Sequence, residues 1–250
     1  MLTFGSLFAG IGGMDLGFER AGMVCKWQVE IDDYARRVLA KHWPDVRRHD
    51  DVRTFPPSDP SEWQVDCIAG GFPCQDISFA GRRDGLDGER SGLWWEFARI
   101  IRILRPRYVV VENVPGLLAP VRDGEQAPIG CVLGELAACG FDAEWDCLPA
   151  SAFGAHFRGD RVFIVANRAK ASCLRRQRKW ENPTRAFAGD EFARLVEREL
   201  QICVPASKGQ RVSDGVSRRV DRLRVLGNSI VPQVAEYIAR RILAVTEDAK

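Results

Sequence analysis

The sequence predicts an α/β fold with a mostly parallel sheet and helices on both of its faces. Segments that read as strands alternate with segments that read as helices up to residue 166, and glycine turns separate several of them. Residues 108–111 are apolar throughout, which is typical of a strand covered on both faces. With 250 residues, 46% of them hydrophobic, the chain can bury the core of one domain of ordinary size.

The elements follow from hydrophobic periodicity and from residues that stop helices. Strands are expected over 2–8, 24–30, 65–69, 108–111, 143–148 and 161–166, with a short further strand ending near Asp51 and Val52. Helices are expected over 14–21, 33–42, 93–104 and 130–139, and from Pro232 onward. Gly22 ends the first helix, Pro44 follows the second and Pro106 ends the third, because these residues do not continue a helix. In the final helix Ala235, Ile238 and Ile242 recur at helical spacing, so that helix packs on another element.

Charge divides the chain more sharply than its net value of +2 suggests. Residues 167–224 hold 15 Lys and Arg against 7 Asp and Glu, a balance of +8, and they lose the strand–helix alternation. Such a basic segment on a mildly acidic body favours a polyanionic partner. A solvated charged face without a partner would give the same composition.

Cysteine usage and hydropathy indicate a protein of the cytoplasm. None of the eight cysteines forms a Cys-x-x-Cys pair, so neither a zinc site nor a redox dithiol is expected, and most of them read as buried free thiols. The chain has no run of 18 apolar residues and no basic segment followed by an apolar stretch at its start. We therefore expect no membrane association.

The first glycine turn predicts a nucleotide site of the Rossmann-like kind. It reads Phe8-Ala9-Gly10-Ile11-Gly12-Gly13, and glycines there allow a ligand close to the backbone amides at a helix start. Glu30 ends the second strand, where an acidic side chain accepts from ribose hydroxyls, and Asp51 could accept from an adenine amino group. A turn without a ligand, and carboxylates that cap helices or face water, are the alternatives. Two carboxylates at successive strand ends favour an adenosine-bearing ligand.

A second turn, Gly70-Gly71-Phe72-Pro73-Cys74-Gln75, places a thiol just after an apolar strand. The carboxyl ends of strands are where α/β proteins bind ligands and perform chemistry, so Cys74 is placed as a nucleophile. An inert buried thiol would not require a turn of this composition.

Five segments in order resemble the cytosine-carbon-5 DNA methyltransferases. They are Phe8 to Gly13, Gly71 to Gln75, Glu112-Asn113-Val114, Arg161 to Val165, and Gly227-Asn228-Ser229 before Pro232. The resemblance implies three parts: an S-adenosylmethionine-binding catalytic domain over 1–166, a small basic target-recognition segment over 167–210, and a return to the catalytic domain over 211–250. The cofactor site that it implies consists of Phe8, Gly10, Gly12, Gly13, Glu30, Ile31, Asp51, Val52, Pro73, Leu93, Asn228 and Ser229.

The reaction that the resemblance implies assigns roles to Cys74, Glu112 and Arg161. Addition of the Cys74 thiolate to carbon 6 of cytosine makes carbon 5 nucleophilic toward a methyl group. Glu112, at the end of a buried strand, is placed to protonate or hydrogen-bond ring nitrogen 3, which requires that it be protonated when it acts. Arg161 is placed to hold the base carbonyl, although a plain surface position for this strand residue is the alternative.

The chain departs from the family next to Arg161. Where the family usually shows Gln-x-Arg-x-Arg, this chain has Phe157-Arg158-Gly159-Asp160-Arg161, so one wall of the base pocket differs. The cationic loop over 75–90 is expected to close over a flipped-out base. The expected DNA contacts are Gln75, Ser78, Arg82, Arg83, Arg175, Arg176, Arg178 and Lys179.

We expect methylation of double-stranded DNA by a monomer in the cytoplasm of a bacterium, encoded by the host or a phage. About 40 residues remain for base reading, which predicts a short recognition site or relaxed specificity. Methylation of cytosine in RNA is one alternative, because the same fold and the same nucleophile would serve that reaction equally. A non-catalytic DNA-binding relative is another.

Overall fold

The computed structural model describes residues 1–73, 92–119, 127–155, 157–168 and 230–247. Its centre is a seven-stranded sheet in the order β3-β2-β1-β4-β5-β7-β6. The strands are β1 (Thr3–Leu7), β2 (Val24–Val29), β3 (Arg47–His49), β4 (Cys67–Gly71), β5 (Tyr108–Asn113), β6 (Asp142–Leu148) and β7 (Arg161–Asn167). The pairs from β3 to β5 are parallel, whereas β7 is antiparallel to both β5 and β6. The prediction of a mostly parallel α/β sheet is confirmed.

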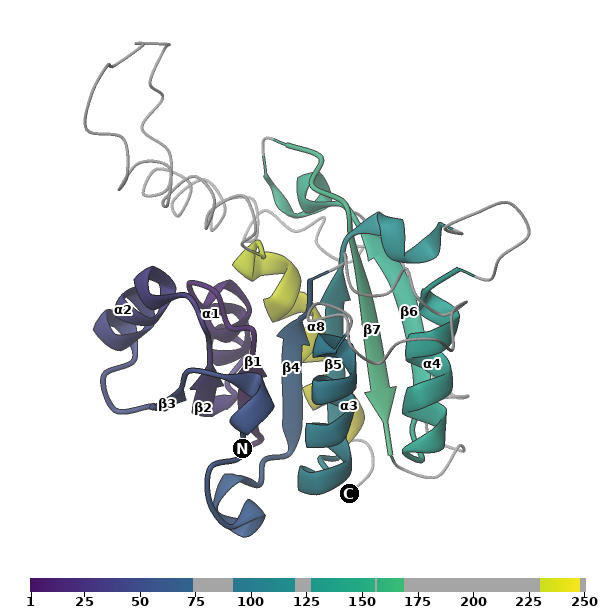
Figure 1. Ribbon diagram of the computed structural model, residues 1–250. Coiled ribbons are helices and arrows are strands. Elements are labelled where there is room, and N and C mark those ends of the chain that lie inside the picture. Colours follow the sequence, from purple (N-terminus) through teal and green to yellow (C-terminus); the bar gives the residue numbers. More distant parts are fainter. Residues whose placement is uncertain (74–91, 120–126, 156, 169–229, 248–250) are drawn as a thin grey trace, which may run out of the picture.

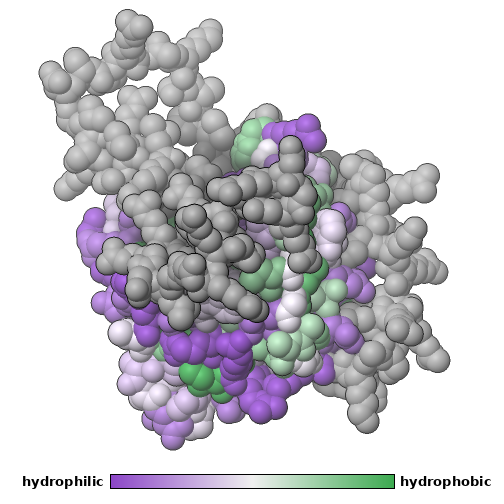
Figure 2. All heavy atoms as spheres, turned by 45° about the vertical axis from the view of Figure 1, so that its right-hand side comes forward, coloured by the Kyte–Doolittle hydropathy of each residue, from purple (hydrophilic) through white to green (hydrophobic). Residues whose placement is uncertain are grey.

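Helices cover both faces of this sheet (Figure 1). The α-helices are α1 (Gly13–Arg20), α2 (Asp33–His42), α3 (Leu93–Leu104), α4 (Ile129–Ala138) and α8 (Pro232–Glu247). The 3₁₀ helices are η1 (Val52–Thr54), η2 (Pro60–Trp63), η4 (Pro115–Leu118) and η5 (Ala150–Phe153). In Figure 1, α3 and α4 lie in front of the sheet and α8 lies behind it. The visible described surface is largely hydrophilic, with smaller hydrophobic areas (Figure 2).

The strand order reverses between β1 and β4, which creates the position where α/β sheets bind ligands. From β1 the chain proceeds outward to β2 and β3, and it then returns to pair β4 with the other side of β1. The carboxyl ends of β1 and β4 therefore lie side by side, with Leu7 opposite Gly70. A crevice opens at such a switch point because the loops that follow the two strands turn to opposite sides.

Strand β5 forms the centre of the core, as its apolar sequence predicts. All of its residues are buried. Val109 and Val111 belong to the hydrophobic cluster on the side of α3 and α4, whereas Tyr108 and Val110 belong to the cluster on the side of α1 and α8. This two-sided burial explains why the strand shows no alternation of apolar and polar residues.

Helices α1 and α8, more than 200 residues apart in sequence, pack closely at Gly17. A Cβ atom added to Gly17 would lie 2.6 Å from Ala235 Cβ and 2.7 Å from the Glu236 nitrogen, and it would overlap the Pro232 carbonyl oxygen. The two backbones can approach this closely only because Gly17 has no side chain. The final helix predicted from Pro232 is confirmed, and it packs on the first one.

The third strand differs from its prediction. β3 covers only Arg47–His49 and ends before Asp51, which instead caps the 3₁₀ helix η1 by accepting from the Arg53 amide at 2.9 Å. The strand is short and lies at the sheet edge, so few hydrophobic residues mark it. The predicted bounds of α2 and α3 agree with the structure, because Asp32 caps α2 and a proline follows each of the two helices, Pro44 and Pro106. The proposed target-recognition segment lies almost wholly outside the described residues.

Asp15 is a fully buried carboxyl group beneath the first glycine turn. It accepts from Ser6 Oγ at 3.0 Å and from Gln28 Nε2 at 2.9 Å, so it joins α1 to β1 and β2. Burial raises the pKa of Asp15 to about 6, and these hydrogen bonds offset only part of that rise.

Among the described helices, none is both long and apolar enough to cross a bilayer.

We expect Gly17→Ala to lower the free energy of unfolding by about 1–3 kcal/mol, because the new methyl group overlaps the backbone of α8. Gly134→Ala in α4 is the matched control. Nothing lies within 4 Å of a Cβ at Gly134, so this change should stabilise the protein by about 0.5–1 kcal/mol. Urea denaturation of both variants measures the two values, and equal stability of the two would contradict the close packing of α1 and α8.

The buried Asp15 should make stability depend on pH. Its pKa is about 6 when folded and 3.8 in the unfolded reference, so the folded protein binds the proton more tightly. Stability should therefore fall as pH rises from about 4 through 6, by about 3 kcal/mol in total from this group. Asp15→Asn should remove that fall and be more stable than wild type at pH 8. Denaturant titrations at pH 5 and pH 8 test this, with the exposed Asp142→Asn as the control expected to change nothing.

Candidate functional site

A cleft of about 810 Å³ opens at the carboxyl edge of the sheet, above the switch point. Its walls come from the ends of β1, β2, β4 and β5, from the start of β7 and from the starts of α1, α2 and α3. Several predicted cofactor and catalytic residues line it: Phe8, Gly10, Gly13, Glu30, Ile31, Asp51, Val52, Pro73, Leu93, Glu112 and Arg161. Residues predicted from separate motifs thus surround one space.

Eleven predicted site residues lie outside the described residues. They are Cys74, Gln75, Ser78, Arg82, Arg83, Arg175, Arg176, Arg178, Lys179, Asn228 and Ser229. Their roles stay predictions. Pro73, the last described residue of its segment, lines the cleft, so the chain continues to Cys74 directly from the cleft wall.

The first glycine turn bends sharply at the end of β1. Phe8, Gly10 and Gly12 have φ angles of +53°, +56° and +85°, which lie in the left-handed region, and the Gly12 amide donates to the Ala9 carbonyl at 2.9 Å. A side chain at Gly12 would overlap the Trp43 ring, so this glycine serves packing behind the cleft wall. Gly10 has nothing within 4 Å of an added Cβ, and its backbone is open to the cleft.

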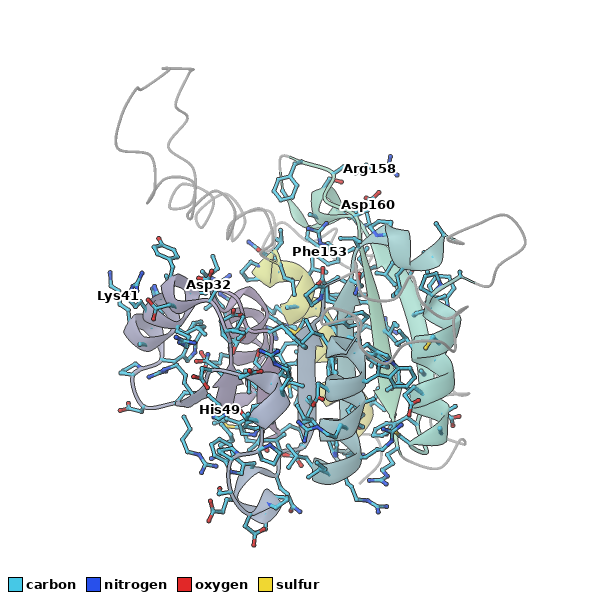
Figure 3. The ribbon with its side chains drawn as sticks, viewed as in Figure 1. Asp32, Lys41, His49, Phe153, Arg158 and Asp160 are labelled. Carbon is cyan, nitrogen blue, oxygen red and sulfur yellow. The ribbon has the colours of Figure 1, made fainter. Side chains whose placement is uncertain are left out.

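Glu30 ties the glycine turn to the start of α2. Its Oε2 accepts from the Gly10 amide at 2.7 Å, and its Oε1 accepts from the Asp32 amide at 2.8 Å. Asp32 in turn caps α2 by accepting from the Ala35 amide at 2.9 Å. Each carboxylate oxygen retains a second lone pair, so Glu30 can still accept from a hydroxyl group in the cleft. Figure 3 labels Asp32 at the start of α2.

Asp51 contributes a second carboxylate to the same end of the cleft. Arg53 Nε lies 3.0 and 3.1 Å from the two oxygens of Asp51, and this pairing holds the pKa of Asp51 below its usual value. The carboxylate is therefore ionised and fixed in orientation. The exposed Ile31 adds an apolar surface to this end of the cleft, with 65% of its area accessible.

Glu112 and Arg161 form an ion pair at the other end of the cleft. Arg161 Nε lies 2.9 Å from Glu112 Oε1, and Arg161 Nη1 also donates to the Asp160 carbonyl at 3.1 Å. Burial raises the pKa of Glu112 to about 7, although the adjacent Arg161 opposes the rise. Glu112 is therefore a buried carboxyl group that holds or releases a proton near neutral pH.

The strands around Glu112 leave it little freedom. Gly71 on β4 pairs with Glu112 on β5, and a Cβ atom at Gly71 would overlap Glu112 Oε2. Gly71 therefore gives the carboxyl group the space that it occupies. The sequence showed this glycine as part of a turn, but its contact with Glu112 follows only from the strand register.

Asn113 was not predicted as a site residue, yet it holds the second turn in place. It is buried, its Nδ2 donates to the Phe72 carbonyl at 2.9 Å, and its Oδ1 accepts from the Val114 amide at 2.9 Å. Its amide thus fixes the carbonyl two residues before Cys74. The available signal was its place beside Glu112, since a polar residue at the end of an apolar strand needs a partner.

Comparison with known proteins identifies the family. Residues 2–201 match the C-5 cytosine-specific DNA methylases. The type II methyltransferase M.NgoFVII of Neisseria gonorrhoeae is 35% identical over 163 residues, which are 65% of this chain and 43% of that protein. The type II methyltransferase M2.BsuMI of Bacillus subtilis is 37% identical over 169 residues, 65% of this chain and 41% of that protein. The matches thus span about two fifths of the length of these curated relatives.

A solved structure shows the same fold. The crystal structure of the S. pombe Dnmt2 methyltransferase has a TM-score of 0.63 to this chain at 17% identity, and the match covers 96% of this chain and 98% of that one. The family match covers most of the sequence, and residues from the motifs that the structure describes line one cleft at the switch point of the sheet. The chain belongs to the C-5 cytosine-specific DNA methylase family.

Proposed function

We propose that this chain transfers a methyl group from S-adenosylmethionine to carbon 5 of a flipped-out cytosine in double-stranded DNA. The observation that carries the proposal is the Glu112–Arg161 pair. A carboxyl group with a raised pKa lies 2.9 Å from a guanidinium group, in the same cleft as the carboxylates of Glu30 and Asp51. A proton donor for a pyrimidine and acceptors for a nucleoside thus share one site.

The cleft suits S-adenosylmethionine, the cofactor that the family uses. Glu30 offers acceptors for ribose hydroxyls, Asp51 offers an acceptor for an amino group, and the exposed Ile31 offers an apolar surface for a purine. When bound, this cofactor supplies an electrophilic methyl group to carbon 5. Phe8, Leu93 and Val52 add apolar walls to the same cleft.

In the proposed reaction, Cys74 is the nucleophile. Its thiolate forms a bond to carbon 6 of cytosine, and the electrons of the 5,6 double bond make carbon 5 nucleophilic. After methylation, loss of the carbon 5 proton restores the double bond and expels the thiolate. Asn113 supports this role because its hydrogen bond to the Phe72 carbonyl fixes the backbone that leads to Cys74.

Glu112 and Arg161 act on the opposite side of the pyrimidine ring. The protonated Glu112 donates to ring nitrogen 3, which stabilises the negative charge that thiolate addition sends into the ring. Arg161 holds the carbonyl at position 2 and keeps Glu112 in place, because its Nε lies 2.9 Å from Glu112 Oε1. Arg161 also donates to the Asp160 carbonyl, so its guanidinium has a fixed orientation.

The substrate of the proposed reaction is a cytosine within duplex DNA, and further residues are assigned to contacts with that DNA. The cytosine must leave the duplex to reach the cleft, which costs a few kcal/mol of unstacking. We assign closure over the base to the loop at 75–90, with Gln75, Ser78, Arg82 and Arg83 on the DNA. Within the proposed target-recognition segment at 167–210, Arg175, Arg176, Arg178 and Lys179 contact phosphates. We assign the reaction to a monomer in the bacterial cytoplasm; the matched relatives are bacterial type II methyltransferases, which supports the bacterial setting.

Covalent trapping tests the proposed function directly. Incubation with S-adenosylmethionine and duplex DNA that contains 5-fluorocytosine should give an adduct stable in denaturing gels, because fluorine blocks the loss that would release the enzyme. Cys74→Ser should form no adduct. Transfer of labelled methyl groups to tRNA instead of DNA would favour the RNA alternative, and DNA binding without an adduct would favour the non-catalytic one.

Glu112→Gln should lower the rate of methyl transfer about 100-fold or more, because the amide cannot deliver a proton to the ring. In wild type the rate should fall as pH rises above about 7, since Glu112 loses its proton there. That fall should be absent from the residual activity of Glu112→Gln. Single-turnover rates from pH 6 to 9 measure both effects. The exposed Glu144→Gln is the matched control, and an unchanged rate in Glu112→Gln would contradict the assigned role.

A further inference from the structure

The loop ahead of Arg161 presents an aromatic ring to solvent. Phe157 is 61% exposed, more than the exposed aromatic residues Trp95 (46%) and Trp145 (45%). It lies four residues before Arg161, a residue of the cleft wall. The loop is tied to η5, because the Ser151 amide donates to the Arg158 carbonyl at 3.3 Å. The ring thus belongs to a fixed loop at the carboxyl edge of the sheet.

Gly159 gives the Phe157 ring a place against the backbone. Gly159 has a φ of +50°, and a Cβ there would lie 2.7 Å from Phe157 Cδ2 and 3.0 Å from Ala150 Cβ. Any side chain at Gly159 would displace the ring. Residues Phe157 and Gly159 are two positions at which this chain departs from the family's Gln-x-Arg-x-Arg pattern, so the ring and the space for it occur together.

The same loop carries an exposed cation. The side chain of Arg158 is 85% exposed, and its Nε lies 2.8 Å from Asp160 Oδ2. Figure 3 shows Arg158 and Asp160 at the top of the ribbon, on the loop that leads into β7. An exposed arginine beside an exposed aromatic ring is the combination that contacts single-stranded nucleic acid, where the arginine meets a phosphate and the ring meets a base.

A second exposed apolar side chain lies at the end of the neighbouring strand. Val114 follows β5, lines the cleft and is 37% exposed. Because Asn113 pairs with Val162, Val114 lies near Arg161, the residue that begins β7. Val114 therefore places an apolar side chain near the ion pair of Glu112 and Arg161, and the Phe157 ring lies on the loop that leads to Arg161.

We propose that the Phe157 ring stacks on an unstacked base of the DNA strand that enters the cleft, while Arg158 contacts an adjacent phosphate. This inference rests on the proposed function. Burial of an exposed phenylalanine ring is favourable, and the flat face of a base can cover the ring. A base next to the flipped cytosine loses a stacking partner, and the ring supplies a new one. Phe157 is thus a DNA-positioning residue, separate from the reacting groups.

Anisotropy titration of a fluorescein-labelled single strand of 20 nucleotides and mixed sequence tests the stacking, because every base in it is free to stack. Phe157→Ala should raise the Kd at least about fivefold, the factor that corresponds to about 1 kcal/mol. Phe157→Trp should restore the wild-type Kd within about twofold. The KM for DNA should rise in Phe157→Ala, whereas the KM for S-adenosylmethionine should not change.

Two controls keep the outcomes distinct. Trp145→Ala removes another exposed aromatic residue, which lies in the middle of β6, and should leave the Kd unchanged. Phe157→Leu keeps an apolar side chain on Gly159 but cannot stack, so it should weaken binding even if the alanine variant fails to fold. Wild-type affinity in Phe157→Leu would overturn the inference while the proposed function stands. A wild-type protein that neither binds nor methylates DNA would overturn both.

Discussion

The antiparallel direction of β7 is the constraint on which the site depends. Among the described strands it alone runs against the others, so its first residue, Arg161, lies at the edge where β5 ends with Glu112 and Asn113. In a parallel strand of the same length, Arg161 would begin at the opposite edge, roughly 20 Å away. The reversal brings a guanidinium group within 2.9 Å of a buried carboxyl group. Without it, burial would raise the pKa of Glu112 further and Arg161 would not orient this carboxyl group.

The cleft combines two kinds of carboxylate, and local structure separates their chemistry. Glu30 accepts from two backbone amides, and the pairing of Asp51 with Arg53 holds the pKa of Asp51 below its usual value, which favours the ionised acceptor. Glu112 lies against Gly71 and is buried, so its proton is held near neutral pH. A site that binds both a nucleoside cofactor and a cytosine needs an ionised acceptor and a carboxyl group that can hold a proton in the same cleft. The fold provides them by burying Glu112 within β5, whereas Asp51 caps the 3₁₀ helix η1 at the cleft.

Sequence reasoning predicted most elements but few contacts. α2 and α3 were predicted within their observed bounds because local signals, an aspartate cap or a following proline, mark helix ends. β3 was placed too late, since a three-residue edge strand has little hydrophobic pattern. Motif residues were predicted as separate pieces, and Glu112 and Arg161 were assigned to the same reaction. The hydrogen bond from Asn113 and the overlap at Gly71 depend on the register between strands, which no single segment encodes.

The backbone contact between α1 and α8 has a consequence for how such a chain can change over evolution. The sheet is complete at the end of β7, and the chain rejoins the core where Pro232 and Ala235 meet Gly17. Both ends of the intervening segment are therefore fixed by the core rather than by that segment. Closing a loop costs only about 0.6 kcal/mol more for each doubling of its length. A segment of different length or sequence can thus be exchanged there while the cleft keeps its geometry, so selection can change what is recognised without rebuilding the chemistry.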